Sequence, residues 1–190
     1  TRLMDPVEGR VLLGSDAAGW VPLAEVAFAS LRERVVMVPQ DGFLFDATVA
    51  DNVRYGRPGM TDDEVAAAFD ELGLSAWVEG LQRGVGTSVG QRGESLSAGE
   101  RQLVAMARAY VADPDLLVLD EATSAVDPAT EQRLTRALDR LTAGRTTLTI
   151  AHRLSTAERA DEVLVVDAGH VVQRGSHAEL VDVEGTYARL

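Results

Sequence analysis

The chain of 190 residues contains neither cysteine nor lysine. The absence of cysteine excludes disulfides, thiolate metal sites and cysteine nucleophiles on these residues. All 18 basic residues are arginine. Chemistry that depends on lysine, such as a Schiff base or the phosphate contact of a P-loop lysine, therefore cannot take place on this chain alone.

Basic residues are also scarce relative to acidic ones. There are 30 acidic and 18 basic residues, which gives a net charge of -12. This balance weighs against nonspecific binding to nucleic acid. No apolar stretch is long enough to span a bilayer. The content of 46% hydrophobic and 25% charged residues is ordinary for a globular protein with a buried core.

Short apolar runs separated by helical patterns dominate the second half of the chain. The runs predict buried strands at 35–38, 116–119, 146–150 and 163–166. A turn at 167–170 predicts a hairpin to a further strand. The helical patterns cover 97–112 and 128–141, and Asp127 followed by Pro128 is a typical helix start. Strands that alternate with helices predict an α/β fold.

The segment from about 46 to 112 has a different pattern, because no run in it predicts a strand. Thr61 begins a helical pattern that reaches Leu72, and a second short helix fits 74–81. A glycine-rich stretch follows at 84–93. We expect a helical subdomain inserted between two strands of the α/β part.

Two carboxylates, Asp120 and Glu121, directly follow the apolar run 116–119. Ligands bind at the carboxyl edge of the sheet in open α/β folds, which is where these acids are expected. The first acid can hold magnesium, and the second can polarise a water molecule that attacks a phosphate. The alternative is a strand that ends in a solvated acidic turn.

A capping box is predicted at Ser97, with Glu100 three residues later. Similar Ser/Thr-x-x-Glu patterns start at Ser30, Thr61, Ser155 and Ser176, so the pattern indicates only a helix start. A helix N-terminus with free amides, a hydroxyl group and a glycine at Gly99 also suits a phosphate.

Order and spacing distinguish these readings. The motifs occur in the same order as in the nucleotide-binding domain of an ABC transporter, which the sequence strongly resembles. Gln40 matches the Q-loop, 96–100 the signature motif, 116–121 the Walker B motif, 124–127 the D-loop and His152 the switch histidine. The resemblance covers nearly the whole chain. It implies an α/β fold with a P-loop NTPase-like ABC ATPase core, in which helices flank a partial parallel sheet, plus an inserted α-helical subdomain.

Two further segments resemble the exporter type of this family. Residues 40–53 resemble the exporter Q-loop and the helix after it, and 87–93 resemble the exporter x-loop. The resemblance implies a division into 1–45 with the Q-loop, 46–112 with the x-loop and signature, and 113–190 with Walker B, D-loop and H-loop.

The resemblance assigns ATP and Mg²⁺ as cofactors, and four residues to the hydrolytic reaction. Asp120 would hold magnesium through water, and Glu121 would be the general base. Gln40 would contact both magnesium and the attacking water, and His152 would bind the γ-phosphate.

Three further residues are assigned to an interface between two nucleotide-binding domains. Ser97 and Gly99 would bind the γ-phosphate of ATP held by the second domain, which is identical or different. Asp127 would join the two sites. The other implied partner is the transmembrane domain of the transporter, with the chain at the cytoplasmic face of the membrane and no nucleic acid bound.

The chain departs from the family pattern at its Walker A motif. The stretch 14–19 has similar glycine spacing, but Trp20 and Val21 stand where Lys and Ser/Thr are required, so we expect a loop there. The first ten residues resemble the stretch just after a P-loop helix. We therefore expect a truncated domain that, by itself, binds ATP weakly or not at all and does not hydrolyse it.

The signature motif also departs from its usual form. Ala98 replaces a glycine and Glu100 replaces the common glutamine. Glu100 adds negative charge near a phosphate site. This charge is expected to lower the affinity of the site for the γ-phosphate when the two domains close on ATP.

Two alternatives stay open. One is a non-catalytic module that docks to a transmembrane-domain partner, consistent with the exporter-like segments at 40–53 and 87–93. The other is a soluble ABC-type repair or chromosome ATPase. Such ATPases carry a long coiled coil between Q-loop and signature, and no heptad run occurs between Gln40 and Leu96.

Overall fold

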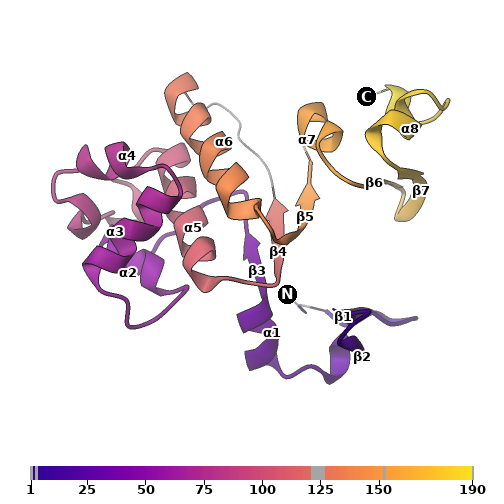
Figure 1. Ribbon diagram of the computed structural model, residues 1–190, viewed down its shortest axis with the longest axis horizontal. Helices are drawn as coiled ribbons and strands as arrows, with labels where there is room; N and C mark the ends of the chain where they lie inside the picture. Colours follow the sequence, from indigo (N-terminus) through magenta and orange to yellow (C-terminus); the bar gives the residue numbers. More distant parts are fainter. Residues whose placement is uncertain (1, 3, 121–126, 152, 190) are drawn as a thin grey trace. The chain divides into compact units, whose positions relative to one another are not determined.

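The computed structural model describes residues 2, 4–120, 127–151 and 153–189 (Figure 1). The chain divides into two compact units, Thr1–Leu148 and Thr149–Leu190. Among the described residues, no helix combines the length and apolar character needed to cross a membrane.

The first unit begins with an antiparallel hairpin. Strand β1 (Leu12–Ser15) pairs with β2 (Gly19–Pro22), and residues 16–18 form the turn between them. A side chain at Gly14 would place its Cβ 2.0 Å from the carbonyl oxygen of Gly19, so the close strand approach requires glycine. The loop expected at 14–19 is thus a hairpin turn, and β2 was not predicted.

A parallel sheet follows the hairpin. Helix α1 (Phe28–Arg34) leads into β3 (Val35–Val38), which pairs in parallel with β4 (Leu116–Asp120). Strand β5 (Thr146–Ile150) completes the order β3-β4-β5. The three strands expected from apolar runs are confirmed.

Helices fill the sequence between the strands of this sheet. They are α2 (Val49–Arg54), α3 (Asp62–Glu71), α4 (Ser75–Glu79) and α5 (Ala98–Ala112) between β3 and β4, and α6 (Pro128–Thr142) between β4 and β5. Helix α5 packs against α2, α3 and α6 (Figure 1). Its side chains Leu103, Val104 and Ala107 are completely buried, which places this helix at the centre of the largest hydrophobic core.

Capping residues define where several of these helices begin. Thr48, Thr61 and Ser97 each accept a hydrogen bond from the backbone N–H three residues later, in complete capping boxes. As expected, 46–112 holds no strand among its described residues and only an isolated antiparallel bridge between Thr48 and Ser88.

The second unit is small and has a core of its own. Helix α7 (Leu154–Glu158) precedes an antiparallel hairpin of β6 (Val163–Asp167) and β7 (His170–Gly175), and α8 (His177–Val181) follows. The hairpin expected at 167–170 is therefore confirmed. Val165, Leu180 and Tyr187 form the buried cluster of this unit.

Candidate functional site

Parallel pairing brings two of the expected site residues to one edge of the sheet. In the register of β3 and β4, Val38 lies opposite Leu119. Asp120 is the last residue of β4 and is half-buried, whereas Gln40 lies two residues beyond the end of β3 and is exposed. Both residues therefore emerge at the carboxyl edge of the sheet, the edge at which open α/β folds bind ligands.

Two other expected catalytic residues, Glu121 and His152, lie outside the described residues. Their neighbours in sequence are described. Asp120 ends β4 immediately before Glu121, and Ile150 ends β5 two residues before His152.

The segment after β3 lies directly against the start of α5. The Gln102 side chain, which is buried, donates from Nε2 to the backbone oxygen of Gln40 at 2.9 Å. Gly42 approaches the same helix so closely that a Cβ there would lie 2.8 Å from the backbone of Arg101. Glycine is therefore required at this contact, which ties the loop bearing Gln40 to the helix that begins after Ser97.

Ser97 caps α5 with its side chain exposed, and Gly99 is buried in the first turn. Glu100 closes the capping box, because its Oε2 accepts the backbone N–H of Ser97 at 2.8 Å. Its other oxygen, Oε1, accepts the indole N–H of Trp77 at 3.0 Å. The indole contact comes from α4, 23 residues earlier, and the sequence pattern gave no sign of it.

The Glu100 carboxyl is charged at neutral pH. Burial acts to raise its pKa. The hydrogen bonds from Trp77 and Ser97 and the positive charge of Arg133 on α6 together lower the pKa by more than burial raises it, so the net effect is a pKa below the ordinary value. The first turn of α5 therefore carries a fixed negative charge.

Asp127 is the N-cap of α6, with Pro128 at the first helical position, as the sequence predicted. Its carboxylate accepts the backbone N–H groups of Ala129 at 3.1 Å and Thr130 at 3.0 Å. The Thr130 side chain, followed by these backbone groups, lowers the pKa of Asp127. The residue thus has a structural role in addition to the interface role expected from the resemblance.

The lowered carboxyl pKa values predict a pH dependence of stability. A depressed folded-state pKa stabilises the fold above the unfolded pKa, and this contribution is lost as the pH falls through the folded value. For Glu100 and Asp127 the loss should begin below about pH 4.5. Asp127→Asn should keep the cap but flatten the acid limb of a plot of unfolding midpoint against pH. An identical acid limb in the wild type and in Asp127→Asn would contradict this assignment.

A buried polar pair fixes the segment that follows Gln40. Asn52 is completely buried on α2, and its Oδ1 accepts both the backbone N–H of Phe45 at 2.8 Å and Nη2 of Arg108 at 3.0 Å. Its Nδ2 donates to the backbone oxygens of Phe45 and Thr48, each at 3.0 Å. All four hydrogen-bonding positions of this amide are therefore occupied.

Arg108 reaches this amide from α5 and also binds the backbone. It donates from Nε to the oxygen of Asn52 at 2.9 Å and from Nη1 to that of Phe43 at 3.2 Å. Burial lowers the pKa of Arg108. Sequence analysis missed this pair, although each residue interrupts an otherwise apolar helix face, which is a signal for a buried polar contact.

The glycine-rich segment 87–93 lies beside the segment that follows Gln40. Backbone hydrogen bonds join Val49 N to Thr87 O at 2.9 Å and Val89 N to Ala47 O at 3.0 Å. The two exporter-like segments of the sequence are therefore in contact.

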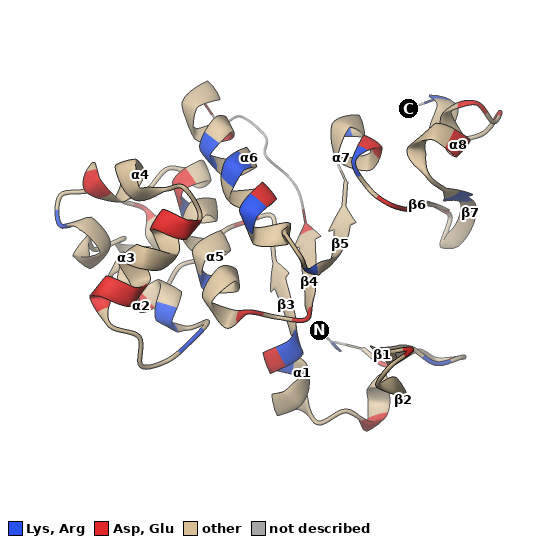
Figure 2. Cartoon of the chain, in the orientation of Figure 1, with Lys and Arg blue, Asp and Glu red and all other residues tan. Residues whose placement is uncertain are grey.

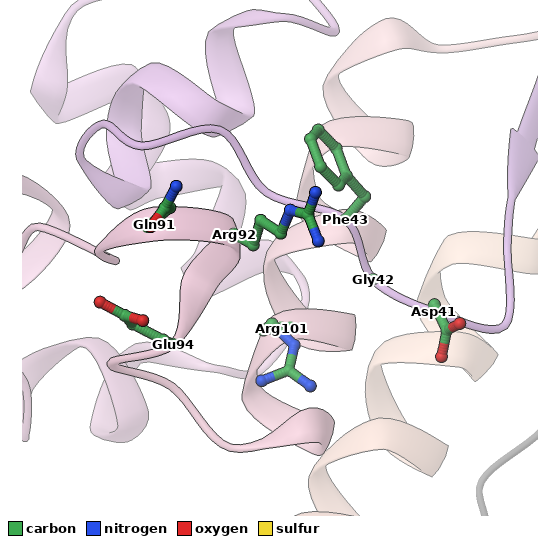
Figure 3. A pocket seen from close by; sticks show the side chains of 7 residues that line it. All are labelled: Asp41, Gly42, Phe43, Gln91, Arg92, Glu94 and Arg101. Atoms are coloured by element: carbon green, nitrogen blue, oxygen red, sulfur yellow. The ribbon is translucent and has the colours of Figure 1, made fainter.

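An open pocket of about 470 Å³ lies where these segments meet the start of α5 (Figure 3). Asp41, Gly42 and Phe43 line it from the segment after β3, Gln91 and Arg92 from the glycine-rich segment, Glu94 from the position just after that segment, and Arg101 from α5. The lining is mixed in charge and includes an exposed aromatic ring, Phe43. Such a surface suits a protein partner with both apolar and charged side chains.

Comparison with known proteins agrees with the fold. The family model described as "ABC transporter" matches residues 1–124. The chain belongs to this family. It is 44% identical over 190 residues to the ATP-dependent lipid A-core flippase of Bordetella avium, covering 100% of this chain and 31% of that protein. It is 46% identical over 182 residues to the fatty acid ABC transporter ATP-binding/permease protein of Mycobacterium bovis, covering 96% of this chain and 28% of that protein.

A solved structure shows the same fold. The structure of a bacterial Atm1-family ABC exporter with ATP bound matches with a TM-score of 0.86 and 41% identity, covering 99% of this chain and 32% of that one. The α/β fold expected from the sequence, with its parallel sheet and ABC ATPase core, is thereby confirmed. The chain spans between 28% and 32% of the length of these relatives.

The donor atoms at the sheet edge fit a hard divalent cation. Gln40 offers an amide oxygen and Asp120 a carboxylate, and oxygen donors are the ligands that Mg²⁺ prefers. Within the described residues no group of three or more His, Cys, Asp or Glu side chains could hold a metal ion.

Proposed function

We propose that this chain is the ATP-binding and ATP-hydrolysing domain of an ABC exporter, and that the hydrolysis powers transport across a membrane. The main support is the parallel pairing of β3 with β4, which brings Gln40 and Asp120 to one edge of the sheet. The ABC transporter model and the exporters named above support the same function.

ATP and Mg²⁺ are the proposed cofactors. Asp120 and Gln40 would hold the ion, directly or through water, and the bound ion would neutralise phosphate charge. Glu121 would accept a proton from the water that attacks the γ-phosphorus, while Gln40 orients that water. His152 would hold the γ-phosphate by hydrogen bonding. Positioning and charge neutralisation carry most of the catalysis in phosphoryl transfer.

The first turn of α5 is proposed to complete a site on a second nucleotide-binding domain. Ser97, whose side chain is exposed, and the backbone at Gly99 would bind the γ-phosphate held by that domain. Asp127, which is exposed at the start of α6, would contribute to the interface between the two domains.

A transmembrane domain is the other proposed partner. It would dock at the pocket where 41–43 meets 91–94, because this pocket combines an exposed ring with charges of both signs. The chain would then work at the cytoplasmic face of the membrane. The net charge of -12 supports the expectation that nucleic acid is not a partner.

We further propose the division 1–45, 46–112 and 113–190 as the functional parts of the domain. The middle part contains α2 to α5 and carries both the pocket segment 91–94 and the signature. The middle part would couple docking of the membrane domain at the pocket to the position of Ser97.

A matched pair of aspartates tests the proposed function. In the full-length protein, Asp120→Asn should lower the rate of ATP hydrolysis at limiting Mg²⁺ by about a hundredfold or more, because a charged oxygen ligand is lost. Asp115 lies just before the opposite end of β4, where it pairs with Arg34 at 2.6 Å. Asp115→Asn should leave hydrolysis unchanged. Equal activity of the two variants, or no hydrolysis by the wild type, would contradict the proposal.

A further inference from the structure

The Glu100 carboxylate is held by two N–H donors that approach separate oxygens. Trp77 is 5% exposed, and its Nε1 donates to Oε1 at 3.0 Å. The backbone N–H of Ser97 donates to Oε2 at 2.8 Å. One donor belongs to the signature segment itself, and the other belongs to α4.

This arrangement suits a carboxylate better than an amide. A glutamine side chain has one acceptor oxygen, and its NH₂ group can only donate. With glutamine at position 100, either the indole or the backbone N–H of Ser97 would face another donor, or both donors would have to share one oxygen. Trp77 and Glu100 are therefore chemically matched.

The negative charge of Glu100 lies in the first turn of α5, where the proposed function places the γ-phosphate held by a second domain. The N–H of Ser97 is already occupied by the carboxylate, and a phosphate at the same helix start would meet a like charge. Arg133 on α6 acts electrostatically on Glu100, and basic segments lie along that helix (Figure 2). The carboxylate is therefore held by hydrogen bonds from α4 and from the residue that caps α5.

We infer that Trp77 and Glu100 are a pair of positioning residues in which the indole fixes a carboxylate at the first turn of α5, and that this carboxylate weakens nucleotide-phosphate binding at Ser97 and Gly99. The effect on nucleotide rests on the proposed function. The match between indole and carboxylate does not rest on the proposed function, and it can be tested without nucleotide.

Denaturant unfolding of the full 190-residue chain tests the match. Wild type, Trp77→Phe, Glu100→Gln and the double variant form a double-mutant cycle. Glu100→Gln should lower the folding equilibrium constant about tenfold more in the presence of Trp77 than in the W77F background. Trp20, which is exposed on β2, provides the control: W20F and E100Q should be additive. Additive effects of W77F and E100Q would overturn the pairing.

ATP hydrolysis by the full-length protein tests the effect on nucleotide. Glu100→Gln should lower the KM for Mg-ATP about three- to tenfold and leave kcat within about twofold. A loss of folded protein alone would lower the measured kcat without moving KM. Glu79, which is exposed at the end of α4, supplies the control, since E79Q removes the same charge from an exposed position.

The outcomes separate the two proposals. An unchanged or raised KM in E100Q, with a wild type that hydrolyses ATP, would overturn the inferred effect and leave the proposed function intact. A wild type that does not hydrolyse ATP would overturn the proposed function and with it the inferred effect on nucleotide, while the unfolding cycle would still decide whether Trp77 and Glu100 are paired.

Discussion

Replacing Glu121 with glutamine is expected to slow ATP hydrolysis by the full-length protein about 10²- to 10⁴-fold while ATP binding is retained. The residue follows Asp120 at the end of β4 and is proposed to take the proton of the attacking water. An amide cannot accept that proton at neutral pH, yet it has nearly the same shape. The substitution should therefore remove the chemical step and preserve the bound state.

Two assays on the same preparation check this prediction. Phosphate release measures turnover, and retention of labelled ATP after rapid desalting measures binding. Glu33, which is exposed on α1, supplies the matched control, and E33Q should behave as the wild type in both assays. Turnover by E121Q within tenfold of the wild-type rate would argue against Glu121 as the general base.

The second large effect is expected at Arg108. Replacing it with methionine should lower the free energy of unfolding by about 3 kcal/mol, because the buried oxygens of Asn52 lose charged donors while the apolar stem is kept. The backbone oxygen of Phe43 loses a donor as well, so the segment after Gln40 is loosened.

Urea unfolding of the purified chain measures this change. Arg136 is exposed on α6, and R136M should alter the free energy of unfolding by no more than about 0.5 kcal/mol. If R108M and R136M unfold at the same urea concentration, the buried network does not stabilise the fold as described.

The sequence predicted the elements whose signals are local. The apolar runs at 116–119 and 146–150 are strands, and Asp127 with Pro128 starts α6. Capping patterns were less selective. Those at Ser97 and Ser176 cap helices, whereas Ser30 and Ser155 lie inside α1 and α7, whose starts are set elsewhere. A capping pattern marks a helix start only when the serine itself has an extended backbone conformation, as Ser97 and Ser176 have.

The contacts that organise the site are not local, and this is why sequence reasoning missed them. Trp77 and Glu100 are 23 residues apart, and Asn52 and Arg108 are 56 apart. Their pairing depends on how α2, α4 and α5 pack, and a single sequence carries no record of that packing. The family resemblance suggested the roles that we propose for Gln40 and Asp120, but it gave no reason for the glutamate at position 100.

The decisive measurement is a structure of the full-length protein with Mg²⁺ and a non-hydrolysable ATP analogue. We expect the triphosphate at the sheet edge formed by the ends of β3 and β4, with Gln40 and Asp120 at the ion and with Glu121 and His152 facing the γ-phosphate. A nucleotide bound at another surface, or Asp120, Glu121 and His152 far apart around the bound nucleotide, would contradict the proposed function.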